Sequence, residues 1–186
     1  MPRSQLTHVE VYLFRRTPRA GLLLLRRAKR DSLPGIWQPV TGRIEPGERA
    51  LDAAVREVRE ETGLDPTRWW RLEHVVSYIH PKSDELRVVA LFAAEMNGRP
   101  RVTLSHEHDA LRWVTLAAAA PMVLWDTQRF ALQALRHQVL GSARIAAALE
   151  IELPPAKRMA STSRRARTAS TSRRRRTTST SRRARG

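Results

Sequence analysis

The sequence predicts a mixed α/β domain followed by a disordered basic tail. Short apolar segments typical of strands lie on both sides of one amphipathic helix, and a second helical stretch follows the last of them. The C-terminal segment has no core-forming pattern. We therefore expect one folded domain over residues 1–153 and a tail over residues 154–186. The length of 186 residues leaves little room for a second folded domain.

Six segments are expected to be extended. They are an opening segment around Val9, Tyr12 and Phe14, then residues 22–25, 36–41, 70–79, 86–95 and 111–114. The turn residues Pro18 and Gly21 separate the first two segments, which we expect to form a hairpin.

Two helices are expected. The first runs from about Glu48 to Thr62, and Gly63 follows it in the place of a left-handed stop. Its apolar residues have the i, i+3, i+4, i+7 spacing of one buried face: Leu51, Ala54, Val55 and Val58. The second helix is an amphipathic stretch from about Trp125 to Leu140.

Charge and cysteine content exclude several functional classes. The formal charge of +16 is concentrated in residues 157–186, which hold 12 of the 34 Lys and Arg and no acidic residue. The remainder has 22 basic and 18 acidic residues, so strong positive charge belongs to the tail alone. The absence of cysteine excludes disulfides, thiolate zinc sites and cysteine nucleophiles. The longest run of Leu, Ile and Val is Leu22–Leu25, and we expect a cytoplasmic protein that does not enter a membrane.

Three glutamates of the first helix form an acidic face. Glu57, Glu60 and Glu61 fall within roughly a third of the helix circumference, beside the apolar face. Carboxylates this close repel one another, and their hard oxygens are the usual ligands of Mg²⁺ or Mn²⁺. The alternative is a solvated face on which these glutamates pair with Arg56 and Arg59.

The segment from Gly42 to Leu64 resembles the Nudix box, G-x5-E-x7-R-E-U-x-E-E-x-G-U, where U is aliphatic. All nine specified positions are occupied: Gly42, Glu48, Arg56, Glu57, Val58, Glu60, Glu61, Gly63 and Leu64. The resemblance implies a Nudix-like α/β/α sandwich with a mixed sheet and a catalytic loop-helix unit. It also implies a hydrolase that cuts a diphosphate linkage.

The resemblance implies roles for individual residues of the box. Glu57, Glu60 and Glu61 would hold one or more Mg²⁺ ions, and the carbonyl of Gly42 would add a ligand. A pair between Arg56 and Glu48 would brace the loop against the helix. Gly42 has the alternative of simply permitting a turn, and Arg56 that of being an ordinary surface cation.

Two further segments are similar to bacterial dihydroneopterin triphosphate pyrophosphohydrolases, a Nudix branch whose members also hydrolyse dNTPs such as dATP. They are Trp37–Gly42 and Ser105–Trp113. The similarity implies that Trp37 and Gln38 contact the base or pterin ring, with core packing as the alternative for Trp37. Glu107 would be a further metal ligand or the general base, or else an exposed loop acid. A zinc pair of His106 and His108 is disfavoured, because no third ligand lies at a motif spacing.

The expected reaction is attack of a metal-activated water on one phosphorus, releasing pyrophosphate and a monophosphate from a dNTP or from dihydroneopterin triphosphate. Either Glu57 or Glu107 would accept the proton of the water. The sequence does not choose between them.

The tail repeats with a period of nine residues, beginning at Ser161, Ser170 and Ser179. Its arginines would contact RNA or DNA without sequence preference through residues 157–186, or the tail is an extension with no dedicated partner. The rival functions are an RNA 5′-end pyrophosphohydrolase and a nucleic-acid-binding protein with a Nudix fold. No oligomeric state is predicted.

Overall fold

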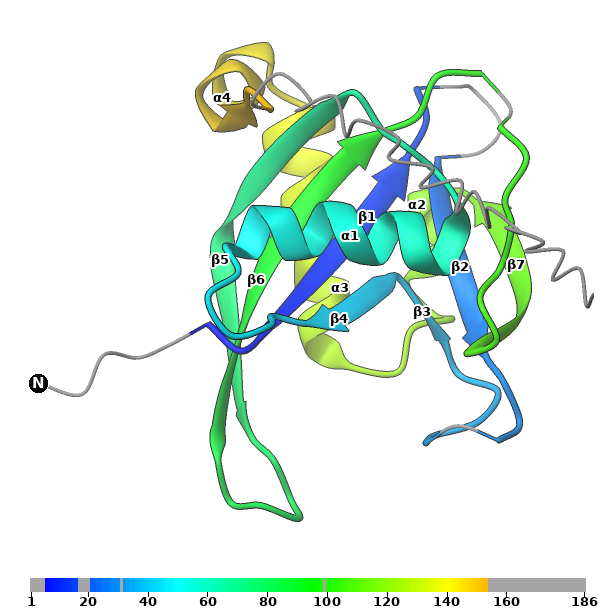
Figure 1. Cartoon of the computed structure of the whole chain (residues 1–186). Coiled ribbons are helices and arrows are strands. Elements are labelled where there is room, and N and C mark those ends of the chain that lie inside the picture. Colours follow the sequence, from blue (N-terminus) through cyan, green and yellow to red (C-terminus); the bar gives the residue numbers. More distant parts are fainter. Residues whose placement is uncertain (1–5, 17–20, 31, 99, 154–186) are drawn as a thin grey trace, which may run out of the picture. The chain divides into compact units, whose positions relative to one another are not determined.

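The structure, a computed structural model, describes residues 6–16, 21–30, 32–98 and 100–153. A mixed sheet has the strand order β3-β2-β1-β6-β5-β8, with β4 paired to β1 and β7 paired to β2 (Figure 1). The strands are β1 (His8–Phe14), β2 (Leu22–Arg27), β3 (Trp37–Gln38), β4 (Val40–Arg43), β5 (Arg68–Ile79), β6 (Leu86–Glu95), β7 (His108–Val114) and β8 (Glu150–Ile151). The predicted tail, residues 154–186, lies outside the described residues.

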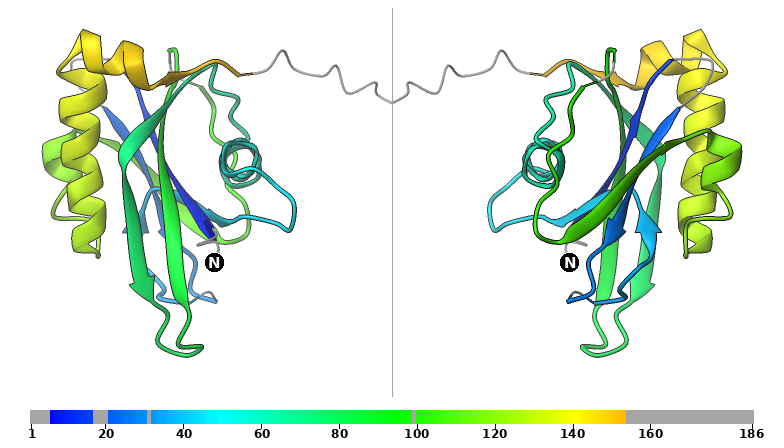
Figure 2. Two further views of the ribbon diagram at one scale, coloured as in Figure 1. Left: turned by 90° about the vertical axis from the view of Figure 1, so that its left-hand side faces the viewer. Right: turned by 90° about the vertical axis from the view of Figure 1, so that its right-hand side faces the viewer.

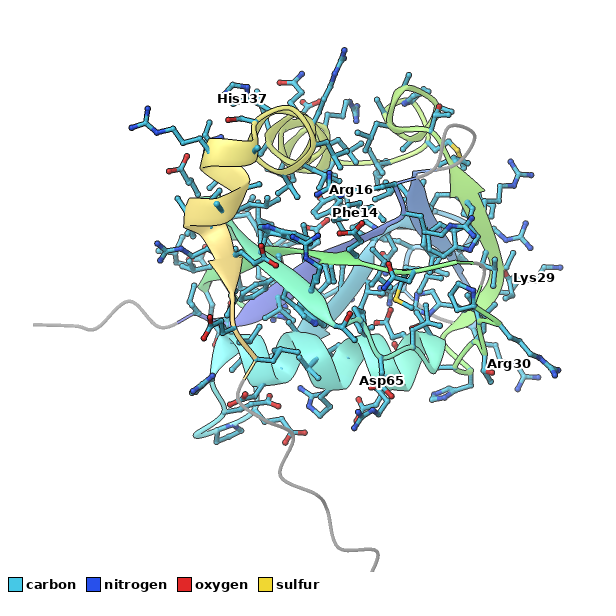
Figure 3. All side chains as sticks on the ribbon, turned by 90° about the horizontal axis from the view of Figure 1, so that it is seen from above. Phe14, Arg16, Lys29, Arg30, Asp65 and His137 are labelled. Atoms are coloured by element: carbon cyan, nitrogen blue, oxygen red, sulfur yellow. The ribbon has the colours of Figure 1, made fainter. Side chains whose placement is uncertain are left out.

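Helices cover both faces of the sheet. The helix α1 (Ala50–Thr62) lies on one face, and the remaining helices lie on the other (Figure 2). These are α2 (Leu116–Ala119), α3 (Asp126–Ala134), the π-helix η1 (Leu135–Leu140) and α4 (Ala143–Leu149). Figure 3 shows the same layers from above, with Phe14 and Arg16 on the side opposite α1. The predicted α/β/α arrangement is confirmed. None of the helices in the described ranges is long and apolar enough to cross a membrane.

Alternation along the strands divides the core into two layers. In β1, Val9, Val11 and Leu13 pack on the α1 side, whereas Tyr12 and Phe14 pack on the α3 side. β1 runs parallel to β6 and antiparallel to β4, so it is buried between neighbours on both edges. β4, which contains Gly42, packs against α1.

Helix α1 ends at the predicted residue, Thr62, but begins two residues after the predicted start. Gly63 has φ 68°, and its N–H donates to the carbonyl of Arg59, which is the left-handed stop that the sequence indicates. The helix begins at Ala50 and not at Glu48, because Gly47 has φ 81° and turns the preceding loop. Glu48 is thereby left in the loop, where its side chain reaches back to the helix.

Other predicted elements need correction. The first two strands pair at Phe14 and Leu22, but most of β1 pairs with β4 and β6 and not with β2. The strand expected at residues 111–114 begins earlier, at His108. The helix expected to Leu140 becomes a π-helix at Leu135, and α4 and β8 were not predicted. Each difference depends on contacts between segments distant in sequence.

A buried carboxyl group joins β1 to α3. Glu10 is 7% exposed, and its carboxylate accepts a hydrogen bond of 2.8 Å from the Tyr12 hydroxyl. The Gln128 side chain also hydrogen-bonds it. Burial raises the pKa of Glu10 to about 7, although both hydrogen bonds oppose the rise. The folded protein therefore prefers the neutral form of this group.

We expect Glu10→Gln to make the protein more stable at pH 8 and to leave its stability nearly unchanged below pH 4. Between the ordinary pKa of 4.5 and about 7, the folded state holds a proton that the unfolded state has lost, so stability falls as the pH rises. The cost above pH 7 is at most about 3 kcal/mol, and an amide does not incur it. Urea unfolding of both proteins at several pH values measures the difference. A pH-independent effect of the substitution would contradict the prediction.

Candidate active site

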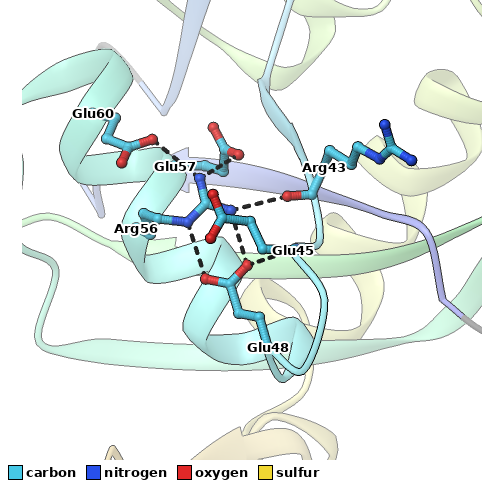
Figure 4. Close-up of polar contacts among 6 residues, drawn as sticks. All are labelled: Arg43, Glu45, Glu48, Arg56, Glu57 and Glu60. Carbon is cyan, nitrogen blue, oxygen red and sulfur yellow. Dashed lines mark hydrogen bonds and ion pairs between the residues drawn. The ribbon is translucent and has the colours of Figure 1, made fainter.

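Arg56 joins the loop before α1 to the acidic face of the helix (Figure 4). Its Nε and one terminal nitrogen donate to the two carboxylate oxygens of Glu48, at 3.0 and 2.9 Å. Its other terminal nitrogen donates to Glu57 at 2.7 Å and to Glu60 at 3.1 Å. The carbonyl of Arg43 accepts a further hydrogen bond of 2.9 Å. One planar guanidinium thus contacts three carboxylates and the end of β4.

The loop is fixed by Glu48. Besides binding Arg56, its carboxylate accepts a hydrogen bond of 3.0 Å from the backbone N–H of Glu45. The hydrogen bond from Arg56 lowers the pKa of Glu48, so this carboxylate stays ionised. The contact between Arg56 and Glu48 that the resemblance implied is present.

Gly42 and Glu57 lie in direct contact. A Cβ atom added to Gly42 would come within 1.9 Å of the Glu57 Cδ and 2.1 Å of its Oε1, so no other residue fits here without displacing that carboxylate. Burial raises the pKa of Glu57, and the nearby Glu60 and Glu107 raise it further, while Arg56 lowers it. The close approach gives Gly42 a specific role in placing Glu57, beyond allowing a turn.

Glu61 is the most buried of the helix acids. It is 3% exposed, and its Oε2 has no hydrogen-bond partner among the residues that the structure describes, although the backbone N–H of Thr41 hydrogen-bonds the carboxylate. Burial raises the pKa of Glu61 well above its ordinary value, and the charges of Glu57 and Glu107 add to the rise. The Glu60 side chain, in contrast, is 57% exposed.

The loop that carries Glu107 is tied to the end of α1. The N–H of Thr103 donates to the carbonyl of Thr62 at 2.8 Å, and the N–H of Ser105 donates to the carbonyl of Glu61 at 3.2 Å. The carbonyl of Glu107 accepts from Ala28 on the other side. These contacts bring Glu107 close enough to Glu57 and Glu61 to raise the pKa of both.

The carboxylates fit a divalent cation in their chemistry. In the described part of the chain, no three acidic or histidine side chains already converge as a complete metal site. However, Glu57, Glu61 and Glu107 repel one another, and the buried Oε2 of Glu61 lacks a donor. A hard dication would relieve both conditions, and carboxylate oxygens are the ligands that Mg²⁺ prefers.

The two residues predicted to bind substrate, Trp37 and Gln38, differ in burial and in their contacts. Trp37 packs against the core on the α3 side, and the guanidinium groups of Arg112 and Arg26 lie 4.9 and 5.8 Å from its ring. Gln38 is 5% exposed, pairs with Leu25 and donates to the Thr41 hydroxyl at 3.2 Å.

Three residues near Glu61 were not identified from the sequence as site residues: Thr41, Arg27 and His108. The positive charge of Arg27 lowers the pKa of Glu61, and the His108 Nε2 lies 3.9 Å from the Glu61 Oε2. Arg27 could have been found, because it continues the alternation of Leu23 and Leu25, which face α1. His106 is exposed, whereas His108 is buried.

Comparison with known proteins gives a consistent result. The NUDIX domain family model matches residues 6–135. The asymmetrical bis(5′-nucleosyl)-tetraphosphatase of Rattus norvegicus is 33% identical over 110 residues, which span 57% of this chain and 73% of that protein. The octanoyltransferase of Myxococcus xanthus is 36% identical over 125 residues, or 67% of this chain, but the chain spans only 32% of that protein.

Among solved structures, that of the E. coli dihydroneopterin triphosphate pyrophosphohydrolase is similar with a TM-score of 0.61. It covers 74% of this chain and all of that chain, at 23% identity, and so shows the shared fold alone. The family model spans most of the described domain and includes every residue of the loop-helix unit around Arg56. This chain therefore belongs to the Nudix hydrolase family.

Proposed function

We propose that this protein hydrolyses a diphosphate linkage in a nucleoside-triphosphate-like substrate, a dNTP or dihydroneopterin triphosphate, with Mg²⁺ as cofactor and Mn²⁺ as a substitute. The products are pyrophosphate and a monophosphate. The observation that carries the proposal is that Glu57, Glu61 and Glu107 lie near enough for their charges to repel, beside a helix braced by Arg56. In a Nudix chain, such an arrangement suits binding and cleavage of a polyphosphate.

The helix carboxylates Glu57, Glu60 and Glu61, with the carbonyl of Gly42, are the groups that would hold the metal. When bound, a divalent ion neutralises charge on the phosphate oxygens and lowers the pKa of a bound water. Arg56 and Glu48 keep the loop and helix in register while the substrate binds. These roles do not require a covalent bond between enzyme and substrate.

Two carboxylates are the proposed acceptors of the proton of the attacking water. Glu57 is half-buried, and its raised pKa favours proton uptake, but Arg56 donates to it at 2.7 Å. Glu107 is exposed on its loop and lies near both Glu57 and Glu61. Comparing the pH dependence of kcat for Glu57→Gln and Glu107→Gln separates the two, because only loss of the base removes the lower limb of the profile.

For substrate recognition we propose different roles for Trp37 and Gln38. Trp37 is partly exposed and lies beside two guanidinium groups, so it remains the proposed contact for a base or pterin ring. Gln38 acts indirectly, because it holds the Thr41 side chain while the Thr41 backbone N–H holds Glu61. Trp37→Ala should raise KM and leave kcat less affected.

The relative from Rattus norvegicus is named for dinucleoside tetraphosphates, which makes these compounds a second candidate substrate class. RNA 5′-end hydrolysis and simple nucleic-acid binding remain the proposed alternatives for the basic residues 157–186. All of these substrates share a phosphoanhydride, so a common assay can rank them.

We expect the full chain and a version ending at Pro154 to hydrolyse the same small-molecule substrate at equal rates with Mg²⁺. The test panel contains dNTPs including dATP, dihydroneopterin triphosphate, diadenosine tetraphosphate, ADP-ribose and 5′-triphosphorylated RNA. The products of each reaction are separated by anion-exchange chromatography, because ADP-ribose and diadenosine tetraphosphate split into two phosphorylated fragments and release neither phosphate nor pyrophosphate. Activity confined to RNA and lost with the tail would favour the RNA 5′-end alternative, and silence across the panel would remove the enzymatic proposal.

A further inference from the structure

A buried imidazole faces the most buried acid of the site. His108, the first residue of β7, is 5% exposed, and its Nε2 lies 3.9 Å from the Oε2 of Glu61. Both side chains are almost fully enclosed. The separation is longer than a hydrogen bond but within the range of an ion-pair contact, and a movement of about 1 Å would bring the two atoms to hydrogen-bond distance.

A shift in strand register places His108 on this face of the sheet. Along β2 and β7, Leu23 lies opposite Trp113 and Leu25 opposite Leu111, and these residues pack on the α1 side. A regular continuation would put Asp109 opposite Arg27. The register instead shifts between Arg26 and Arg27, so that Arg27 lies opposite His108.

The shift changes which side chain meets Glu61. Without it, the carboxylate of Asp109 would occupy the position on the α1 side and repel Glu61. With it, Asp109 pairs with Arg26 at 2.6 Å, and the imidazole of His108 faces Glu61. The register shift therefore places the imidazole of His108, and not the carboxylate of Asp109, beside Glu61.

We propose that His108 is a positioning residue that fixes the carboxylate of Glu61 at its Oε2. This inference rests on the proposed function, because Glu61 is one of the proposed metal ligands. The Thr41 N–H holds the carboxylate from β4, the positive charge of Arg27 acts from β2, and His108 faces its second oxygen from β7. The charges of Glu57 and Glu107 push against it.

Fixing a ligating carboxylate matters because its orientation decides how strongly it binds a metal. Removing a residue that holds a metal ligand in place commonly lowers metal affinity by about 10- to 100-fold. Without the imidazole of His108, the Oε2 of Glu61 would lose the polar ring that faces it, and the carboxylate would turn or take up a proton. The effect should appear in metal binding and kcat, and only weakly in KM.

The test compares His108→Gln, His108→Asn and His108→Leu in the full chain. A Gln amide reaches the position of the imidazole Nε2, whereas an Asn amide reaches only that of Nδ1. We expect Gln to keep Mn²⁺ affinity within about threefold, and Asn and Leu to weaken it by about tenfold or more. Mn²⁺ binding is measured by electron paramagnetic resonance without substrate, alongside kcat and KM. His106→Leu, which changes the exposed neighbouring histidine, is the matched control.

Thermal unfolding without metal shows whether each variant folds. If the Leu variant does not fold, the comparison of the Gln and Asn variants still tests the role of His108. Equal Mn²⁺ affinities for these two variants, or an unchanged affinity for a folded Leu variant, would overturn the role of His108. If the unaltered protein itself neither binds Mn²⁺ nor hydrolyses any substrate, the proposed function fails as well. The two failures are therefore distinguishable.

Discussion

Glu60→Gln is expected to lower kcat by about a hundred- to a thousandfold while the protein remains as stable as before. The substitution removes one negative charge from the proposed metal site, and a lost metal contact of this kind accounts for several kcal/mol of transition-state stabilisation. The Glu60 side chain is 57% exposed and has one described hydrogen bond, to Arg56. Its removal should therefore cost little folding energy.

Steady-state rates over a range of Mg²⁺ concentrations, together with thermal unfolding, test this prediction. Asp52→Asn is the matched control, since Asp52 is an exposed acid in the first turn of the same helix and pairs with Arg49. The control should behave as the unaltered protein. If the Glu60 variant were equally active, the acidic face would be an ordinary solvated surface and the proposed catalytic role would be wrong.

Gly42→Ala is expected to reduce kcat/KM by about a hundredfold through displacement of Glu57. The added methyl group would overlap the Glu57 carboxylate at 1.9 Å from Cδ, and the least costly response is movement of that side chain away from the site. Misplacing a reacting or ligating group by about 1 Å costs rate on this scale. Because the end of a side chain gives way and not the backbone, the unfolding temperature should change by only a few degrees.

Gly21→Ala provides the comparison for a glycine without such a neighbour. Among the described residues, a Cβ atom at Gly21 meets only the Val114 carbonyl, at 3.8 Å, which is ordinary contact. Its activity should be unchanged. A Gly42 variant with normal kcat/KM would show that Glu57 can be placed correctly from another position, and the close contact would then have no catalytic consequence.

The elements that the sequence predicted well are those determined by local pattern. The buried face of α1 follows from the spacing of Leu51, Ala54 and Val58, and its end follows from Gly63. The acidic face also follows, because three glutamates at fixed helical intervals must lie together. The family that this segment predicts is confirmed by a family model that matches residues 6–135.

The remaining features depend on which segments become neighbours. Helical geometry places Glu60 and Glu61 side by side. Thr41 and the loop that carries Glu107 contact Glu61, however, and its side chain is only 4% exposed, whereas that of Glu60 is 57% exposed. His108 faces the site only because the β2–β7 register shifts at Arg27. No periodicity within residues 105–113 contains that information. The role of Gly42 likewise becomes visible only when α1 packs on β4.

The contacts of Arg56 make the loop and the helix a single mechanical unit. The same rigid plane binds Glu48 on the loop and Glu57 and Glu60 on the helix, so it cannot rotate to suit one partner without leaving another. A disturbance at Glu48 would therefore be transmitted to two carboxylates that it does not touch. Lysine at position 56 would keep the charge but lose this rigid link. The metal affinity of such a variant would then depend on how the loop is held as well as on the ligating carboxylates.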